Sequence, residues 1–412
     1  HDAADVPIPK TPSPMSVVLI TVDSVVAKRT SLFEGERDTT PNLKRWAEKA
    51  ASFQRGYSTA AWTSLAMSSL FRGLYPRRLN WTRVYETSRL RLIRAPIKDN
   101  LRKGERVRAA FGMPRNEKLK PLQWWLNRRG MYSVAVVDDG KTEFMAEHVG
   151  GFPGFDRYLV SDTLPRRKRN DAGLSTRAIK VLGELPKDQE FFMWVHYFGP
   201  HLPDDTHKGV TRFGETPADL YDHELVFMDK HLGRFLDAIE KLEAERPIAV
   251  FMTSDHGEHI TKTGRSHGTR LNEAMIHAPL LMRAPGVPGS RPEALASIVD
   301  IMPTILALTE TPGPSYFDGV DLRDVIANTD AVKERILLAE TWHLNRDSGQ
   351  LKRDLITAFD GKHKLTKDRI KQTRKLTEQG SERNLIDELR APHLERAMDR
   401  YLEANSATHL ED

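Results

Sequence analysis

Four side chains that could bind a metal ion stand at the ends of apolar runs. They are Asp23, His196, and the neighbouring pair Asp255 and His256. If those runs are parallel strands of one sheet, their carboxyl ends meet at one edge, where ligands bind in open α/β sheets. This mixture of oxygen and nitrogen donors suits zinc or manganese better than calcium. Taken singly, each residue has an ordinary explanation, because such an Asp often caps the next helix and such a His is usually hydrogen-bonded.

Thr63 is the candidate nucleophile. It precedes the segment 64–71, whose apolar spacing is helical, so its hydroxyl is expected at a helix N-terminus, where free N–H groups and the helix dipole favour an anion. A hydroxyl alone is a poor nucleophile, but a divalent metal ion would lower its pKa and neutralise charge on the transferred group. The alternative is that Thr63 is simply an N-cap.

Three further histidines lie in or beside loops. His196 and His201 stand five residues apart in a segment that Pro200 and Pro203 stiffen, and His267 belongs to a later Ser-His-Gly sequence. We expect His201 and His267 to bind a second metal ion, to hold the anionic group, or to protonate the leaving oxygen, with His196 as the weaker candidate for proton transfer. A structural or merely exposed histidine is the alternative for each.

The segment before His267 carries one acidic and two basic candidates. Glu258 is expected to orient a metal ligand through a hydrogen bond. Lys262 and Arg265 lie in the short basic loop that follows, and we expect them to contact the anion of the substrate. An arginine in a loop is, however, more often simply exposed to solvent.

The apolar runs alternate with helical patterns, which is typical of a parallel sheet covered by helices on both faces. Strands are expected at 16–22, 132–137, 191–195, 247–253 and 278–282, and helices from Pro41 onward and at about 217–243 and 294–309. We therefore predict an α/β fold. A Pro-rich linker is expected at 1–14 and a catalytic domain at 15–312.

The pattern changes after Pro312. Shorter segments at 335–341, 353–359 and 362–368 are separated by turn-like residues, and a helical pattern follows at about 392–404. This arrangement predicts a C-terminal α+β subdomain at 313–412, made of a small antiparallel sheet and one packed helix.

Composition excludes several classes of protein. A chain of 412 residues with 39% hydrophobic residues and a mean hydropathy of −0.51 is neither membrane-embedded nor largely disordered. The absence of cysteine excludes thiol nucleophiles, zinc-thiolate sites and disulfides.

The net charge of +5 is unevenly spread, because residues 81–130 carry fourteen Lys or Arg and four acidic residues. We assign a basic insertion to about 81–120. It could steer an anionic substrate or face an anionic membrane surface. The alternative is that its charges only keep a solvated insertion soluble. Without interleaved aromatic residues, it is not expected to bind nucleic acid.

Several segments resemble, in order from about residue 16 to 390, the sulfatase branch of the alkaline phosphatase superfamily. They include VVLITVDS, RDTTPNLKRWAEKA, AWTSLAMSSLFRGLYP, FMWVHYFGPHLP, TSDHGE and HAPLLMRAPGV. The resemblance implies an alkaline phosphatase-like sheet between helical layers. Sulfatases carry Cys or Ser in a C/S-x-P-x-R signature that is oxidised to formylglycine, whereas the stretch from Thr63 to Met67 has neither the Pro nor the Arg. Threonine cannot follow that route, which argues against ordinary sulfate-ester hydrolysis.

The candidate metal ligands also depart from those of sulfatases. The family usually has two adjacent acidic ligands where this chain has Asp23 and Ser24, and calcium sulfatases have an Asp-Asn pair where it has Asp255 and His256. This chain instead offers one acid, a Thr, an Asp and a His. That combination is similar to the metal-ligand set of the phosphoethanolamine and phosphoglycerol transferases. That resemblance implies that Asp23, Thr63, Asp255 and His256 bind a zinc or manganese ion, and that Thr63 becomes phosphorylated.

The same resemblance implies that His201 and His267 bind a second ion or the substrate. We therefore expect a metal-dependent phosphoryl-transfer enzyme that acts on an anionic phosphodiester, or on a lipid- or glycan-linked substrate, through a covalent phosphothreonine. Hydrolase and transferase both remain open, because water or an acceptor hydroxyl could release the group. The alternatives are an atypical sulfatase or phosphonate monoester hydrolase without formylglycine, and an inactive binding module of the same fold.

Relatives of this kind imply a location as well. We expect the catalytic domain on the periplasmic or extracellular face of a bacterial membrane, with a membrane tether or surface contact outside these residues.

Overall fold

The computed structural model describes most of the chain, namely residues 7, 12–33, 35–87, 92–94, 106–114, 118–138, 152–160, 171–345, 348, 350–405 and 410–411. Most of the predicted linker at 1–14 lies outside these residues. The same holds for parts of the predicted basic insertion at 81–120, which are 88–91, 95–105 and 115–117.

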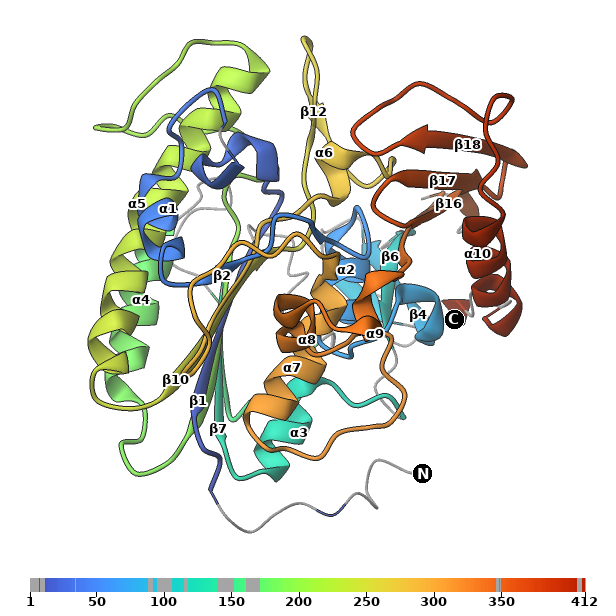
Figure 1. The fold of residues 1–412 in the computed structure, drawn as a ribbon. Helices are drawn as coiled ribbons and strands as arrows, with labels where there is room; N and C mark the ends of the chain where they lie inside the picture. Colours follow the sequence, from blue (N-terminus) through green and yellow to red (C-terminus); the bar gives the residue numbers. More distant parts are fainter. Residues whose placement is uncertain are drawn as a thin grey trace.

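A seven-stranded sheet forms the centre of the molecule (Figure 1). In spatial order its strands are β2 (Ala51–Ser52), β13 (Leu280–Arg283), β10 (Ile248–Ser254), β1 (Ser16–Val22), β9 (Phe191–Tyr197), β7 (Tyr132–Val137) and β8 (Arg157–Val160). The strands from β10 to β8 are parallel, whereas β13 and β2 are antiparallel to their neighbours. The predicted mostly parallel sheet is confirmed. The apolar run at 278–282 lies close to β13, one of its antiparallel strands.

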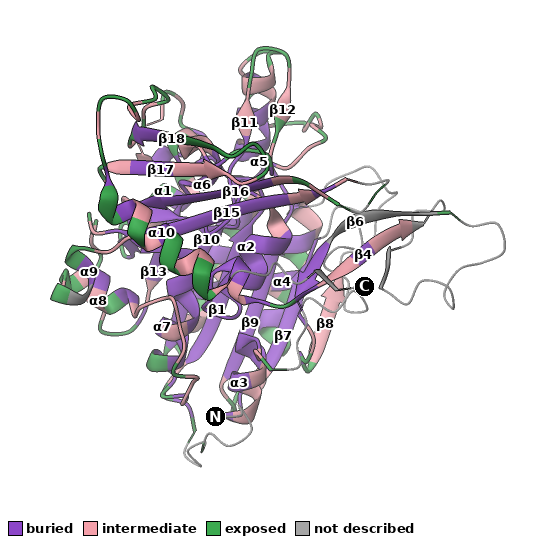
Figure 2. Ribbon diagram, turned by 90° about the vertical axis from the view of Figure 1, so that its right-hand side faces the viewer, coloured by how far each residue is buried: buried purple, intermediate pink, exposed green. Residues whose placement is uncertain are grey.

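Both faces of this sheet are buried, which is why its strands read as continuous apolar runs (Figure 2). Alternate residues of β1 enter two separate cores, Leu19 on one side and Ile20 on the other. The core around Ile20 is closed by α1 (Pro41–Ala47), α4 (Asp171–Glu184) and α5 (Pro217–Glu243). The core around Leu19 is closed by α2 (Thr63–Leu70), α3 (Leu122–Arg128), α7 (Ile301–Leu308) and α8 (Leu322–Ala327).

The strand register aligns the carboxyl ends of the three central strands. Val22, the last residue of β1, pairs with Tyr197 of β9 and with Ser254 of β10. Neighbouring strands lie about 4.8 Å apart, so the residues that follow Val22 and Ser254 start adjacent loops at the same edge. This register brings the loops that carry the sequence-predicted metal ligands together.

A second sheet lies in the C-terminal part of the chain, where β15 (Leu337–Leu344), β16 (Leu351–Phe359), β17 (His363–Asp368) and β18 (Thr373–Glu378) are antiparallel. Helix α10 (Pro392–Ala404) packs Leu394 and Met398 against it. The predicted small antiparallel sheet with one helix is confirmed. The prediction missed β18, because that strand is mostly polar and only Leu376 and Thr377 of it are buried.

The predicted basic insertion is not simply a solvated loop. Strands β4 (Trp81–Thr87), β5 (Leu92–Arg94) and β6 (Val107–Pro114) form a small sheet with β19 (Leu410–Glu411). The side chains of Trp81, Val84 and Met113 are fully buried in this sheet. The two ends of the segment are therefore anchored in the core.

The remaining elements are short. They are β3 (Gly56–Tyr57) paired with β14 (Ala296–Ser297), β11 (His259–Ile260) paired with β12 (Arg265–Ser266), α6 (Glu273–Ile276), α9 (Asp330–Lys333), and 3-10 helices η2 (Ala27–Arg29), η3 (Ser31–Phe33), η4 (Pro76–Arg78) and η7 (Ile298–Asp300). The helix predicted at about 294–309 was too long. Ser297 is the N-cap, and Asp300 accepts its backbone N–H, so the helical region begins only after Ser297. Among the described residues, no helix is both long and apolar enough to cross a membrane.

Candidate active site

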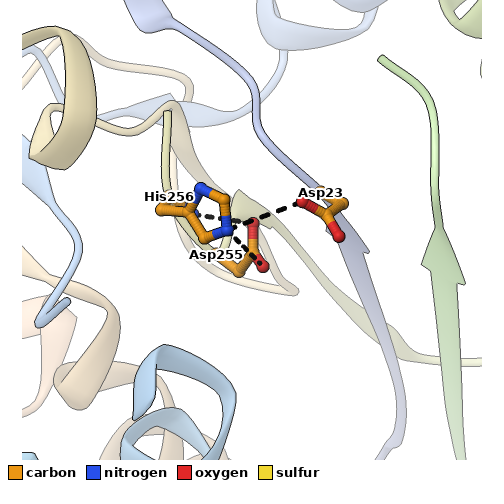
Figure 3. A group of neighbouring side chains, drawn as sticks. All are labelled: Asp23, Asp255 and His256. Carbon is orange, nitrogen blue, oxygen red and sulfur yellow. Dashed lines mark hydrogen bonds and ion pairs between the residues drawn. The ribbon is translucent and has the colours of Figure 1, made fainter. Parts of the chain in front are cut away.

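Three buried side chains converge at the carboxyl edge of the central sheet. Asp23 follows β1, and Asp255 and His256 follow β10; each offers one ligand atom, and these atoms lie within 4.8 Å of one another (Figure 3). Nε2 of His256 lies 3.6 Å from Oδ1 of Asp23 and 3.5 Å from Oδ2 of Asp255. The sequence predicted these three residues as neighbours, and the structure brings them together.

The loop after β1 is shaped by Ser24, which has a left-handed backbone with φ of 61°. In this conformation its N–H donates to Oδ1 of Asp255 at 3.1 Å, and its hydroxyl donates to Oδ1 of Asp23 at 2.7 Å. A left-handed non-glycine residue is uncommon and is held here by these two contacts. Ser24 therefore orients both carboxylates.

The hydrogen bonds of His256 define its tautomer. Nδ1 lies 2.8 Å from the carbonyl oxygen of Gly257, so Nδ1 carries the proton and donates to it. Nε2 is then the unprotonated nitrogen, and it faces the two carboxylates. The hydroxyl of Thr63 lies 3.1 Å from Nε2 and donates to it.

Thr63 is the first residue of α2, and the N-cap position is Trp62, which makes no side-chain capping bond. The first N–H groups of a helix have no acceptor within the helix, and the helix dipole favours negative charge there. Thr63 is only partly buried. Its hydroxyl thus lies between the helix N-terminus and the Asp23, Asp255 and His256 cluster.

Burial has the largest effect on the pKa values of the three groups in this cluster. Burial, with the charge of Asp255 beside it, raises the pKa of Asp23 to about 7. Burial also raises the pKa of Asp255 to about 7, although the N–H groups of Ser24 and His256 oppose the rise. Burial lowers the pKa of His256. Two buried carboxylates side by side are unfavourable unless a cation compensates them.

The donor set fits a divalent metal ion. Oδ2 of Asp255 is buried and accepts no hydrogen bond from any residue that the structure describes. Two carboxylates, an imidazole nitrogen and a threonine hydroxyl are ligand types that zinc and manganese accept. A metal ion held by these groups would satisfy the unpaired carboxylate oxygen.

A row of imidazoles extends from this cluster. The ring centroids of His256 and His267 lie 4.9 Å apart, and those of His267 and His201 lie 4.7 Å apart. Nδ1 of His267 lies 3.3 Å from the fully buried carboxylate of Glu258. Although burial acts in the opposite direction, this carboxylate raises the pKa of His267 above its usual value. Nδ1 of His201 donates to the carbonyl oxygen of Leu202 at 2.6 Å.

His196 is placed differently from these histidines. It is 1% exposed on β9, and its Nδ1 lies 2.7 Å from the hydroxyl of Thr21. Burial, with the charge of His256, lowers its pKa to about 3. A neutral, enclosed imidazole of this kind is a poor proton donor at neutral pH, which disfavours the predicted role in proton transfer.

The two basic candidates lie outside the cluster. Arg265 is bound to the chain itself, because its guanidinium forms an ion pair with Asp204 at 2.8 Å and donates to the carbonyl oxygen of Pro200 at 3.1 Å. Its side chain is 1% exposed, so its charge is paired within the protein, and contact with a substrate anion stays a prediction. Lys262 is exposed on the turn between β11 and β12.

Sequence reasoning missed two aromatic side chains beside the site. The ring of Trp62 lies 5.5 Å from that of His267 and 4.8 Å from that of His343 on β15. Trp62 directly precedes Thr63, and this position is the only signal that could have indicated it. No local pattern points to His343, because the C-terminal sheet brings it to the site through tertiary packing.

Comparisons with known proteins agree with this architecture. A family model described as "Sulfatase" matches residues 16–311. Arylsulfatase K of Rattus norvegicus is 35% identical over 104 residues, which are 25% of this chain and 18% of that protein. The inner membrane protein YejM of Salmonella typhi is 24% identical over 314 residues, which are 74% of this chain and 44% of that protein. The chain thus spans less than half the length of these curated relatives.

A solved structure gives the same picture of the fold. The phosphonate monoester hydrolase SpPMH of Silicibacter pomeroyi superposes with a TM-score of 0.69 at 17% identity, covering 95% of this chain and 95% of that one. At this low identity, the likeness concerns the fold alone.

Proposed function

The chain belongs to the sulfatase family of the alkaline phosphatase superfamily, and from this premise we propose that it is a metal-dependent phosphoryl-transfer enzyme with Thr63 as its nucleophile. One observation carries the proposal: Oγ1 of Thr63 lies 3.1 Å from Nε2 of His256, at the cluster that His256 forms with Asp23 and Asp255. These four residues would hold zinc or manganese. Such an ion lowers the pKa of a coordinated hydroxyl and neutralises charge on a phosphoryl group.

The residues of the chain account for the rest of the first half-reaction. Oγ1 of Thr63 gives up its proton to solvent and attacks the phosphorus of a phosphodiester, and the bond from phosphorus to the leaving oxygen breaks. The N-terminus of α2, whose first N–H groups have no acceptor within the helix, would stabilise the phosphoryl oxygens. His267, held by Glu258, or His201 donates a proton to the leaving oxygen. The product is a phosphothreonine that keeps the second ester group of the substrate.

In the second half-reaction, the oxygen of water or of an acceptor alcohol attacks the phosphothreonine. The bond from phosphorus to Oγ1 breaks, and Thr63 regains its proton. Hydrolase and transferase share all residues of the first step, so the identity of the acceptor distinguishes them.

A second candidate is hydrolysis of phosphonate monoesters or sulfate esters by the unmodified Thr63. The fold likeness to a phosphonate monoester hydrolase favours including it. Sulfate-ester hydrolysis by the usual family route needs an oxidisable Cys or Ser at this position, and the chain has Thr63 there.

We also place the substrate at a membrane. The match to the inner membrane protein YejM extends over 74% of this chain, which supports a location at the periplasmic or extracellular face of a bacterial membrane. A lipid- or glycan-linked phosphodiester is the substrate class that suits this location.

The test is a substrate panel with added Mn²⁺ or Zn²⁺: bis(p-nitrophenyl) phosphate, p-nitrophenyl phenylphosphonate and p-nitrophenyl sulfate. We expect the phosphodiester to react fastest, and Thr63→Ala to lower kcat/KM by about a thousandfold or more. Ser68→Ala is the matched control, because Ser68 is a buried hydroxyl of the same helix. Near-normal turnover by Thr63→Ala would exclude the covalent role, and fastest turnover of the sulfate would favour the second candidate.

A further inference from the structure

Tyr221 of α5 contacts the loop that carries Asp23, although it belongs to no donor set. Its hydroxyl donates to the carbonyl oxygen of Ser24 at 2.8 Å and accepts the N–H of Val26 at 2.8 Å. The whole side chain is buried. Both hydrogen bonds of one hydroxyl are therefore used on the backbone immediately after the metal-ligand candidate.

This contact fixes the residue on which both carboxylates depend. Ser24 has the left-handed φ of 61°, and its N–H and hydroxyl hold Asp255 and Asp23. A left-handed serine needs surrounding contacts to persist. The hydroxyl of Tyr221 binds the carbonyl oxygen of this same residue, and so limits rotation of the peptide that follows it.

Arg265 of β12 lies over the ring of the same tyrosine. Its guanidinium carbon is 4.9 Å from the centre of the Tyr221 ring. The same guanidinium forms an ion pair with Asp204 and donates to the carbonyl oxygen of Pro200. Pro200 directly precedes His201, and Arg265 itself is two residues before His267. The stacked side chains of Tyr221 and Arg265 thus contact or belong to the segments that carry three site residues, which are Asp23, His201 and His267.

We propose that Tyr221 and Arg265 form a single positioning unit that sets the loop of Asp23 against the loops of His201 and His267. The proposal rests on the proposed function, in which those loops supply the metal ligands and the proton donor. Neither residue touches the reacting atoms. The hydroxyl of Tyr221 acts on the Asp23 loop, the guanidinium of Arg265 acts on the His201 loop, and the stacked contact joins the two effects.

The first experiment is titration of the metal-free protein with Mn²⁺ alone by calorimetry. Tyr221→Phe keeps the ring under Arg265 and removes only the hydroxyl. We expect the Kd for Mn²⁺ to rise about fivefold or more, because the loop of Asp23 loses both of its hydrogen bonds to this hydroxyl. Tyr197→Phe is the matched control, because its buried hydroxyl bonds to Ser175 at 2.8 Å on another helix. That control is expected to lower the Tm comparably and to leave the Kd unchanged.

The second experiment is hydrogen exchange of the backbone around His201, which needs no substrate. Arg265→Lys keeps the positive charge but loses the stacked planar fork, so we expect faster exchange at residues 198–205 and a kcat about tenfold lower. Arg246→Lys is the matched control. Arg246 also donates to two carbonyl oxygens, those of Pro186 and Gln189, and lies over an aromatic ring, but it does so away from these loops.

Combining the two substitutions tests the coupling. We expect the double variant to lose less Mn²⁺ affinity and activity than the two single losses together predict, because each substitution breaks one link of the same connection between the Asp23 loop and the His201 loop. Additive losses, or a Kd that Tyr221→Phe and Tyr197→Phe change equally, would overturn the inference while leaving the proposed function intact. If the wild-type protein bound neither Mn²⁺ nor Zn²⁺, both the proposed function and this inference would fail.

Discussion

Acid is expected to destabilise this protein in part through the buried residue His196. The hydroxyl of Thr21 accepts the indole N–H of Trp194 at 2.9 Å and lies 2.7 Å from Nδ1 of His196. With one lone pair used by Trp194, the hydroxyl can donate its own proton to Nδ1 of a neutral His196. Burial, with the charge of His256, lowers the pKa of His196 from 6.5 to about 3.

The sign of the effect follows from this lowered pKa. A base whose pKa is lower in the folded state than in the unfolded state contributes its full stability above the unfolded-state pKa. This contribution is lost as the pH falls toward the folded-state pKa. The window for His196 therefore runs from pH 6.5 down to about 3. Between pH 6.5 and 5, the loss amounts to about 2 kcal/mol, at roughly 1.4 kcal/mol per pH unit.

Urea unfolding of the metal-free protein at pH 7.5 and pH 5 measures this loss. His196→Asn is the comparison, because the carbonyl oxygen of asparagine can accept the hydrogen bond from Thr21 but does not titrate. Groups that do not interact with His196 contribute equally to both proteins, so the difference between them isolates His196 and its interaction with His256. We expect the wild-type free energy of unfolding to fall by about 2 kcal/mol more than that of the variant. Parallel pH profiles of the two proteins would refute this reasoning.

Three other predictions concern the site and its support. Gly257→Ala would place a Cβ 1.9 Å from a backbone carbonyl oxygen, so we expect urea unfolding to show a loss of about 2 kcal/mol or more, whereas Gly264→Ala, with open space around it, should be nearly neutral. Arg77→Met should lower the unfolding free energy by about 3–5 kcal/mol, measured by denaturation, because the buried carboxylates of Glu340 and Asp354 lose their ion pairs with this guanidinium and, among the described residues, only Asp354 keeps a second arginine, Arg369. Asp255→Asn should weaken Mn²⁺ binding about 100-fold in calorimetry, and an unchanged Kd would remove Asp255 from the ligand set.

Much of the central sheet could be predicted because its strands are buried on both faces. The expected strands at 16–22 and 132–137 coincide with β1 and β7. The apolar character of a segment does not indicate, however, whether the strand runs parallel or antiparallel to its neighbours, so the antiparallel orientation of β13 could not be derived. Strand β18 was missed for the opposite reason, since most of its residues are polar and partly exposed.

The convergence of Asp23, Asp255 and His256 was predictable from one assumption, that polar residues after parallel strands share an edge. The strand register supplies the reason. The role of Arg265 was not predictable, because it depends on partners from a distant loop and from α5. The same applies to His343, which reaches Trp62 only because the C-terminal sheet packs against the catalytic part.

The measurement that tests the central claim most directly is mass spectrometry of the protein quenched during turnover of bis(p-nitrophenyl) phosphate with Mn²⁺. The account predicts that the peptide containing Thr63 gains the mass of the transferred phosphoryl group, and that this species is absent from Thr63→Ala. Steady turnover with an unmodified Thr63 peptide at every quench time, or phosphoryl mass on a different residue, would contradict it.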